Sequence, residues 1–341
     1  MAGGRARALL VLALLTGVPG AACGRSSAPE VVVYTSEDQV FSEPILKDFE
    51  KTARITVRAV YDTEETKSAG VALRIVAERD HPQADVFWGN EPLRAIMLQQ
   101  QGLLASYASP AGKDIPARYR DPAGYWTGFA ARARVIVYNT DQVKPAEAPS
   151  SVRDLADPRW KGRAGLANPL FGTTTTQVAA LWSLWGDQAA KRFLAEVKDN
   201  RVKIVTSNGE ARDLVASGEL AWAFADSDDA NVALLQHKPV AVVYPDQAGL
   251  GTLVMPNVVA LLKGAPHPDQ ATRLVDYLLS PQVEERLAAG AAAQMPLHPG
   301  VPVPANVKPV SAIKDMAVRF SDLGKTSERI LSYLNEWAGA R

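Results

Sequence analysis

Apolar residues along the chain form short continuous runs that alternate with longer stretches in which they recur every three or four positions. The first run, Val31–Tyr34, is apolar throughout, the pattern of a strand buried on both faces. A helix is predicted to follow from Ser42 or Glu43, with Pro44 in its first turn. Strands are expected over 31–34, 55–61, 84–88, 134–139, 164–167, 202–205, 220–225, 240–244 and 254–262. Helices are expected over 62–76, 93–101, 173–185, 187–197, 211–217, 268–279 and 284–289, with one or two closing helices within 311–337.

Strands that alternate with helices predict a mostly parallel sheet covered on both faces. The alternation occurs twice, which favours an α/β fold with two lobes and a ligand cleft between them. We expect residues 30–138 to begin lobe one and 139–253 to form lobe two. Residues 254–341 should return to lobe one and add the closing C-terminal helices. The strand-like segments 132–138 and 254–262 flank the second set and are the predicted hinge.

The N-terminal segment has the features of an export signal. Arg5 and Arg7 precede the apolar run Ala8–Leu15, and small residues lead to Cys23, the only cysteine of the chain. The run is too short to cross a membrane core of about 30 Å as a helix. We predict a signal peptide over 1–22, lipidation of Cys23 and a tether over 23–29. The mature protein should then be periplasmic or at the cell surface and be held to the membrane only by its lipid anchor. The alternative is a soluble exported protein cut nearby.

Composition narrows the class of protein. Removal of residues 1–22 takes two arginines and no acids from 37 basic and 37 acidic residues, which leaves a net charge of −2. A nearly neutral chain lacks the basic surface that nucleic-acid binding requires. The remaining length is enough for two domains with a large core. We expect a monomer whose stability comes from packing, because no second cysteine is present to form a disulfide within the chain.

Polar and acidic loops follow four of the predicted strands. Ligands of open α/β sheets bind beyond the carboxyl ends of the strands, so these loops are candidates for a binding site. Facing carboxylates repel one another unless a cation neutralises them, and their oxygens suit Ca²⁺, Mg²⁺, Mn²⁺, iron(III) or an organic amine. The alternative is that each loop only caps a helix. The candidate residues are Ser36, Glu37, Asp38, Thr63, Glu64, Asn90, Glu91, Asp226, Asp228 and Asp229.

A run of threonines has the opposite chemistry. Thr173 and Thr174 stand at the start of an apolar helix, where free N–H groups and hydroxyls can bind an anion. Asn208 belongs to a second helix start of the same kind. The alternative is a single capping threonine, with helix capping also at Asn208. Nucleophile-elbow, zinc-protease, dinucleotide and P-loop motifs are absent from the sequence, so we expect no enzyme.

Three stretches resemble the extracellular solute-binding proteins of ABC importers, family 1, and are similar to their ferric-iron-binding branch. They are Val31–Ser36, Ala84–Glu91 and Gly218–Ala223. The resemblance implies a periplasmic-binding-protein fold of type II, with a small ligand in the cleft between two α/β lobes and delivery to a membrane permease.

The ferric branch has an acidic residue after the third strand, which Glu91 matches, and an anion at a helix start, which Thr173 and Thr174 could hold. Its pair of adjacent tyrosines is missing, and Asp228 and Asp229 stand near that position. Asp38 occupies the position of the branch's early histidine. The resemblance therefore implies iron(III) or another hard cation, with or without a synergistic anion, on Asp38, Glu91, Asp228 and Asp229. No other cofactor is expected.

Two alternatives remain. One is a binding protein for a phosphonate, phosphate ester or other small organic anion, in which the threonines hold the anion and the acids cap helices or bind its amine. The other is a secreted metal-dependent hydrolase whose paired carboxylates act as acid and base.

Overall fold

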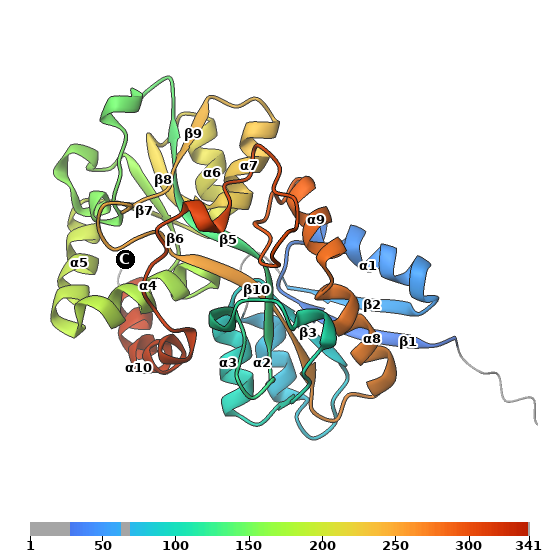
Figure 1. Cartoon of the computed structure of the whole chain (residues 1–341). Helices are drawn as coiled ribbons and strands as arrows, with labels where there is room; N and C mark the ends of the chain where they lie inside the picture. Colours follow the sequence, from blue (N-terminus) through green and yellow to red (C-terminus); the bar gives the residue numbers. More distant parts are fainter. Residues whose placement is uncertain (1–27, 63–68, 340–341) are drawn as a thin grey trace, which may run out of the picture.

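The computed structural model describes residues 28–62 and 69–339. Cys23, Thr63 and Glu64, which we singled out in the sequence, lie outside the described residues. The described chain forms strands in two groups with helices around each, and Figure 1 shows the two groups on either side of the crossing strands β5 and β10. We call them lobe one and lobe two.

The strands of lobe one combine parallel and antiparallel pairs. β1 (Glu30–Thr35) pairs in parallel with β2 (Thr56–Tyr61) on one side and with β3 (Val86–Gly89) on the other. β10 (Val254–Leu262) runs antiparallel to β3, to the short β4 (Leu104–Ala105) and to β5 (Thr127–Asn139). The three valines of β1 are consecutive and do not alternate with polar residues. The strand is largely buried, as this continuous apolar run predicts.

Lobe two is built on the second half of β5. This half pairs antiparallel with β8 (Trp222–Asp226) and with β9 (Val240–Val243). Beyond β8 lie β6 (Ala164–Ala167) and β7 (Lys203–Val205), in parallel. All thirteen residues of β5 are buried, because the strand runs through both lobes.

Helices cover both groups of strands. In lobe one they are α1 (Gln39–Ala53), α2 (Gly70–Ala77), α3 (Pro92–Gln100), α8 (Pro268–Leu278) and α9 (Pro281–Ala289). In lobe two they are α4 (Gly172–Trp185), α5 (Asp187–Asp199), α6 (Asn208–Ala216) and α7 (Ser227–Leu235). A single closing helix, α10, spans Phe320–Gly339. Short 3₁₀ turns lie at 110–112, 117–119, 145–147, 152–156, 158–160 and 310–312.

Three helices differ most from the sequence-based expectation. α2 begins at Gly70 rather than at residue 62. α1 begins at Gln39, because the backbone carbonyl of Asp38 accepts from Phe41 and Ser42, and Pro44 therefore lies inside the helix rather than in its first turn. α7 was not predicted. Leu234 and Leu235 are exposed at 43% and 55%, so its apolar residues do not mark one buried face.

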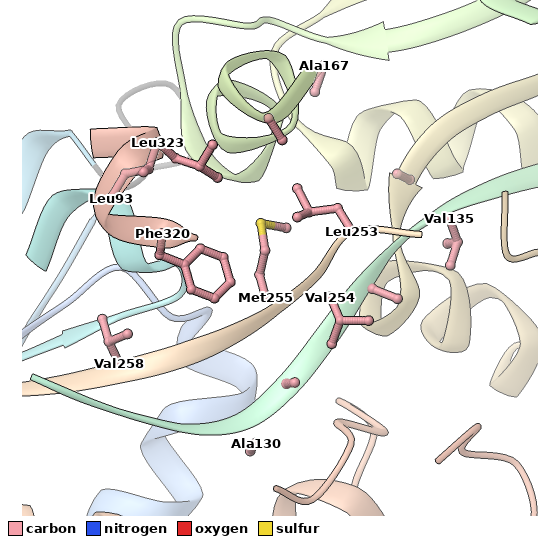
Figure 2. Packing of buried hydrophobic residues seen from close by; sticks show 14 of the residues in the cluster. Leu93, Ala130, Val135, Ala167, Leu253, Val254, Met255, Val258, Phe320 and Leu323 are labelled. Atoms are coloured by element: carbon pink, nitrogen blue, oxygen red, sulfur yellow. The ribbon is translucent and has the colours of Figure 1, made fainter. Parts of the chain in front are cut away.

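The C-terminal helix connects the two lobes through apolar packing. α10 packs against α3 of lobe one and α4 of lobe two, and Figure 2 shows Phe320 and Leu323 beside Leu93 and Met255 of the central core. Further along α10, the Trp337 indole donates to the Leu194 carbonyl at 2.9 Å. Burial of each large apolar side chain contributes about 1.5–3 kcal/mol. α10 is therefore a packing element of both lobes.

Within the described ranges, we find no helix with the length and apolar content needed to span a membrane.

Candidate ligand-binding site

A polar pocket lies where the carboxyl ends of strands from both lobes meet. Its cavity volume is about 20 Å³, room for a water molecule or a single ion. Lobe one contributes residues after β1 and β3, and lobe two contributes the starts of α4, α6 and α7. The lining residues are Asp38, Asn90, Arg132, Ala167, Phe171, Gly172, Thr173, Thr206, Ser207, Asn208, Asp226, Asp228 and Asp229.

The two loops of lobe one are joined to each other. The Ser36 hydroxyl donates to the Asn90 side-chain oxygen at 3.1 Å and accepts from the Asn90 backbone N–H at 3.1 Å. Both residues are buried. The loops after β1 and β3 thus form one rigid wall of the pocket, because β1 and β3 are neighbours in the sheet.

Three aspartates of lobe two form an acidic cluster. Asp226, Asp228 and Asp229 each offer a carboxylate oxygen, and these oxygens lie within 4.8 Å of one another. Asp38 of lobe one lines the same pocket. Carboxylate oxygens at this spacing suit a hard cation or an ammonium group.

Glu91, which we predicted as a metal ligand, lies away from this cluster. It is the N-cap of α3, where its carboxylate accepts from the N–H groups of Leu93 at 2.6 Å and Arg94 at 3.2 Å. The Thr176 hydroxyl of lobe two donates to the same carboxylate at 3.0 Å. Burial raises the pKa of Glu91, against the lowering effect of Arg94 and these hydrogen bonds. Its oxygens serve the helix start and a contact between the lobes, and it is absent from the pocket lining.

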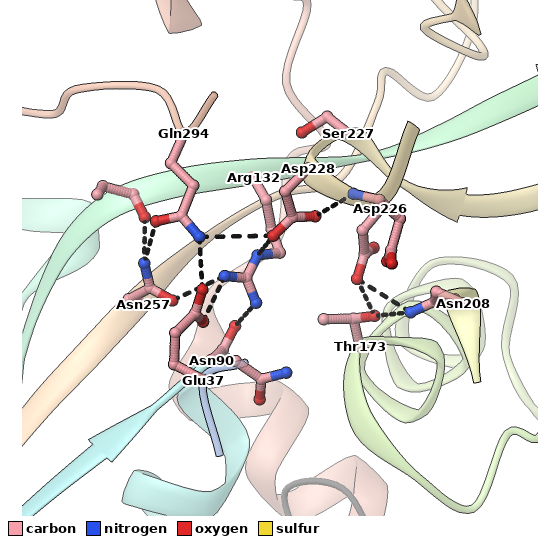
Figure 3. Close-up of polar contacts among 12 residues, drawn as sticks. Glu37, Asn90, Arg132, Thr173, Asn208, Asp226, Ser227, Asp228, Asn257 and Gln294 are labelled. Atoms are coloured by element: carbon pink, nitrogen blue, oxygen red, sulfur yellow. Dashed lines mark hydrogen bonds and ion pairs between the residues drawn. The ribbon is translucent and has the colours of Figure 1, made fainter. Parts of the chain in front are cut away.

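Arg132 is the first of two buried arginines that we did not predict at the site. It lies on β5, is 3% exposed, and forms ion pairs with Glu37 at 2.6 Å and Asp228 at 2.9 Å. It also donates to the Asn90 carbonyl at 3.0 Å and to the Asn257 side chain at 2.9 Å. Figure 3 shows its guanidinium among these groups.

Glu37 and Arg132, which pair with each other beside the acidic cluster, both have strongly shifted pKa values. Burial raises the pKa of Glu37 to about 7, although Arg132 opposes the shift and the charges of Asp228 and Asp38 add to it. Burial lowers the pKa of Arg132, but the nearby Asp228, Glu37 and Asp226 outweigh that effect, and its pKa is raised. Arg132 therefore stays charged at every physiological pH and neutralises part of the negative charge around it.

Arg134, the second arginine, is fully buried two residues further along β5. It forms an ion pair with Asp226 at 2.7 Å and donates to the hydroxyl oxygens of Thr173 at 3.0 Å and Thr174 at 3.2 Å. It also donates to the Asn208 side chain at 2.9 Å. The Thr173 hydroxyl in turn donates to Asp226 at 2.6 Å. The threonine hydroxyls, which we expected to hold an anion, instead hold the Arg134–Asp226 pair in place.

The helix starts remain as a feature that attracts anions. α4, α6 and α7 begin at the pocket after Phe171, Ser207 and Asp226. Ser207 caps α6 through the N–H of Glu210, whereas Phe171 offers no side chain to the first N–H groups of α4. The positive ends of these helix dipoles favour an oxyanion beside the carboxylates.

The sequence carried a signal for the arginines but not for Gln294, which also joins this network. Arg132 and Arg134 interrupt an otherwise apolar run that reads as a buried strand, and buried charges require partners. Gln294 follows α9 in an irregular segment, yet it is fully buried and donates to Glu37 at 2.8 Å. No local pattern distinguishes it from a surface glutamine.

A two-lobed α/β fold with a polar pocket between the lobes defines a ligand-binding protein of the periplasmic type. The model of the bacterial extracellular solute-binding protein family matches residues 83–315, and the chain belongs to that family. Its members are non-enzymatic and extracellular or periplasmic, and they deliver a small ligand to an ABC permease.

Three individual proteins illustrate the similarity. Iron uptake protein A1 of Synechocystis sp. is 27% identical over 319 residues, which cover 90% of this chain and 86% of the relative. A periplasmic protein of Salmonella paratyphi A that is named for binding 2-aminoethylphosphonate is 28% identical over 266 residues, 76% of this chain and 73% of the relative. The crystal structure of iron-bound HitA from Pseudomonas aeruginosa superposes with a TM-score of 0.82 at 26% identity and covers 91% of this chain and 99% of that chain.

Proposed function

We propose that this solute-binding protein captures a ligand that combines a positive centre with an oxyanion. One observation carries the proposal: the aspartate cluster and three helix starts line the same pocket. Carboxylates attract a cation, and the N-terminal ends of helices attract an anion. A ligand with only one sign of charge would leave one of these two features unmatched.

The first candidate is iron(III) or another hard cation bound with a synergistic anion. Asp38, Asp228 and Asp229 would face the cation, and the start of α4 would hold the anion. The similarity to iron uptake protein A1 and to iron-bound HitA supports this candidate.

The second candidate is an organic phosphonate or phosphate ester that carries an amine. Buried arginines already neutralise several carboxylates, since Arg132 pairs with Glu37 and Asp228 and Arg134 pairs with Asp226. The remaining negative charge at the pocket is modest and suits a single ammonium group better than a trivalent cation. The relative named for 2-aminoethylphosphonate supports this candidate.

Calorimetric titration distinguishes the two candidates. The mature protein, freed of bound solutes by dialysis against a chelator, is titrated with ferric citrate, with ferric citrate plus phosphate, and with 2-aminoethylphosphonate in the presence of chelator. Binding of iron that chelator abolishes supports the first candidate. Binding of 2-aminoethylphosphonate in chelator supports the second. Heat from none of the three titrations would contradict the proposal of a ligand with both charges.

The variant Asp229→Asn tests whether the ligand binds in this pocket. Asp213→Asn is the matched control, because both aspartates pair with Arg212. Arg212 pairs with Asp229 at 3.6 Å and with Asp213 at 2.8 Å, but Asp213 is 66% exposed and does not line the pocket. Asp229→Asn should weaken binding of whichever probe binds at least tenfold, the order expected for one charged hydrogen bond. Asp213→Asn should leave the affinity unchanged. Equal affinities for the two variants would place the ligand elsewhere.

We propose further that the mature protein is a lipid-anchored monomer that begins at Cys23, with lobe one over 30–138, lobe two over 139–253 and a return to lobe one over 254–341. The uniqueness and position of Cys23 support the anchor. Intact-mass measurement of protein from a bacterial membrane fraction tests it. An unmodified thiol, or a mature terminus elsewhere, would contradict it. Light scattering of the detergent-free protein after removal of the first 23 residues tests the monomer.

A further inference from the structure

β5 contains a bulge in the part that pairs with β10, a few residues before its pairing with β8 of lobe two begins at Arg134. The register between β5 and β10 shifts between Pro256 and Asn257, which leaves Ala130 as the extra residue. The φ of Ala130 is 41°, a left-handed conformation that alanine seldom adopts. Its N–H donates to Glu284 at 2.7 Å, and its carbonyl accepts from the Asn257 side chain at 2.8 Å. Two side chains therefore hold the bulged peptide in place of the strand ladder.

Asn257 links this bulge to the acids of the pocket. Its side-chain oxygen accepts from Arg132 at 2.9 Å, and its amide donates to Gln294 at 2.7 Å. Arg132 and Gln294 both reach Glu37 of lobe one and Asp228 of lobe two. All five residues are buried, and Figure 3 shows them around one guanidinium. A continuous chain of hydrogen bonds thus runs from the pocket to the bulge.

The two buried arginines of β5 differ in which lobes they join. Arg134 bonds only to lobe two, through the starts of α4 and α6 and the end of β8. Arg132 bonds to the loops after β1 and β3 and to β10 in lobe one, and to the start of α7 in lobe two. Arg132 thus bonds to acidic groups of both pocket walls, Glu37 of lobe one and Asp228 of lobe two.

We propose that Arg132, with Asn257 and Gln294, couples the two lobes, setting their separation around the pocket and tying it to the bulge at Ala130. Arg132 acts as an internal cation that draws Glu37 and Asp228 together across the pocket. Arg132, Asn257 and Gln294 are positioning residues, since they act through the acids and the bulge. This inference goes beyond the proposed function and does not depend on which ligand binds.

The substitution Arg132→Lys tests the coupling with the least disturbance. A lysine keeps the positive charge between Glu37 and Asp228, but its compact ammonium cannot reproduce the planar set of donors that also reaches Asn90 and Asn257. Arg134→Lys is the matched control on the same strand, because it loses an equivalent set of bonds within lobe two alone.

The separation of the lobes is measured by electron–electron double resonance without any ligand. Spin labels are attached at Leu73→Cys on α2 and Leu235→Cys on α7, which are 61% and 55% exposed, in a Cys23→Ser background. Cys23 is the only native cysteine, so only the two introduced positions are labelled. Protein is purified through denaturation and refolding to remove bound solutes, and circular dichroism checks that each variant is folded.

We expect one narrow distance distribution for the parent protein and for Arg134→Lys. Arg132→Lys should add a longer-distance population, with the open-to-closed ratio raised about tenfold, as expected for loss of one charge-assisted bond. Gln294→Leu, which leaves the arginine in place, should shift the distribution in the same direction and serves if Arg132→Lys does not fold. The proposal is overturned if the folded variant keeps the parent distribution, or if Arg134→Lys broadens it equally.

Discussion

Asp226 and Asp229 of the acidic cluster should differ sharply in what they contribute to stability, and Asp226→Asn provides the first test. Asp226 is the carboxylate that pairs with Arg134, at 2.7 Å, and the two side chains are 5% and 0% exposed. The amide would leave a fully buried guanidinium without its counter-charge. Removal of one partner of a buried ion pair costs about 3–5 kcal/mol. We expect that loss in the free energy of unfolding.

Asp229→Asn should behave differently in the same measurement. Asp229 pairs with Arg212 at 3.6 Å, and the two side chains are 15% and 16% exposed, so this longer and less buried pair should cost less to break than the Asp226–Arg134 pair. Urea unfolding followed by tryptophan fluorescence and circular dichroism measures both variants. The chain has seven tryptophans, and Trp160, Trp182 and Trp222 report on lobe two.

A double variant separates an orphaned charge from a lost contact. Asp226→Leu combined with Arg134→Met removes both charges and fills the same space with apolar atoms, so it should recover part of the loss seen for Asp226→Asn. The reasoning would be refuted if Asp226→Asn were within about 1 kcal/mol of the parent protein, since a buried pair of this geometry cannot be neutral to break.

Two further predictions concern the scaffold around the hinge. When protonated, His298 can donate from both ring nitrogens, to Glu284 at 2.9 Å and to a backbone carbonyl at 2.9 Å. Burial lowers its pKa, but these bonds and the charge of Glu284 raise it overall. The stabilising effect of the protonated ring is therefore complete below about pH 6.5 and is lost as pH rises through the raised pKa. The unfolding free energies of the parent protein and of His298→Gln should accordingly converge at high pH. A difference between them that does not change with pH would contradict this prediction. Gly251→Ala should lower stability by about 2–4 kcal/mol in thermal unfolding, because its φ is 89° and a Cβ would lie 2.6 Å from a backbone oxygen. Gly249→Ala, whose Cβ would have no neighbour closer than 3.8 Å, is the control and should be close to neutral.

The sequence was sufficient for most of the fold because the longer strands have simple patterns, and among the described strands only the two-residue β4 was not expected as a strand. The β10 prediction of 254–262 matches the structure, and the apolar runs that became β1 and β8 lie where the pattern placed them. α7 escaped prediction because it presents exposed leucines beside a polar start. Periodicity reports burial on one face, and this helix does not have a continuous apolar face.

From the sequence, the candidate site could be predicted only for residues at the carboxyl ends of strands. Ser36 and Asn90 follow β1 and β3, and Asp226 ends β8, so the fold brings Asn90 and Asp226 to one pocket. Which groups pair within the pocket depends on long-range contacts that no local pattern encodes. Arg134 bonds to Thr173, 39 residues away, and that contact changes a presumed anion ligand into a support for an ion pair.

The pairing of charges also fixes how a ligand should lie if the proposed function holds. Arg134 balances Asp226 at the inner wall of the pocket, and Arg132 serves both Glu37 and Asp228. Asp38 and Asp229 are the remaining carboxylates of the pocket lining, near the starts of α1 and α7, and Arg212 pairs with Asp229 at 3.6 Å. The start of α4, where Phe171 offers no side chain to the first N–H groups, lies beside Asp226, because the Thr173 hydroxyl of α4 donates to its carboxylate. A positive centre should thus approach Asp38 and Asp229 while its oxyanion meets α4, because the reverse orientation would set like charges against each other at both ends.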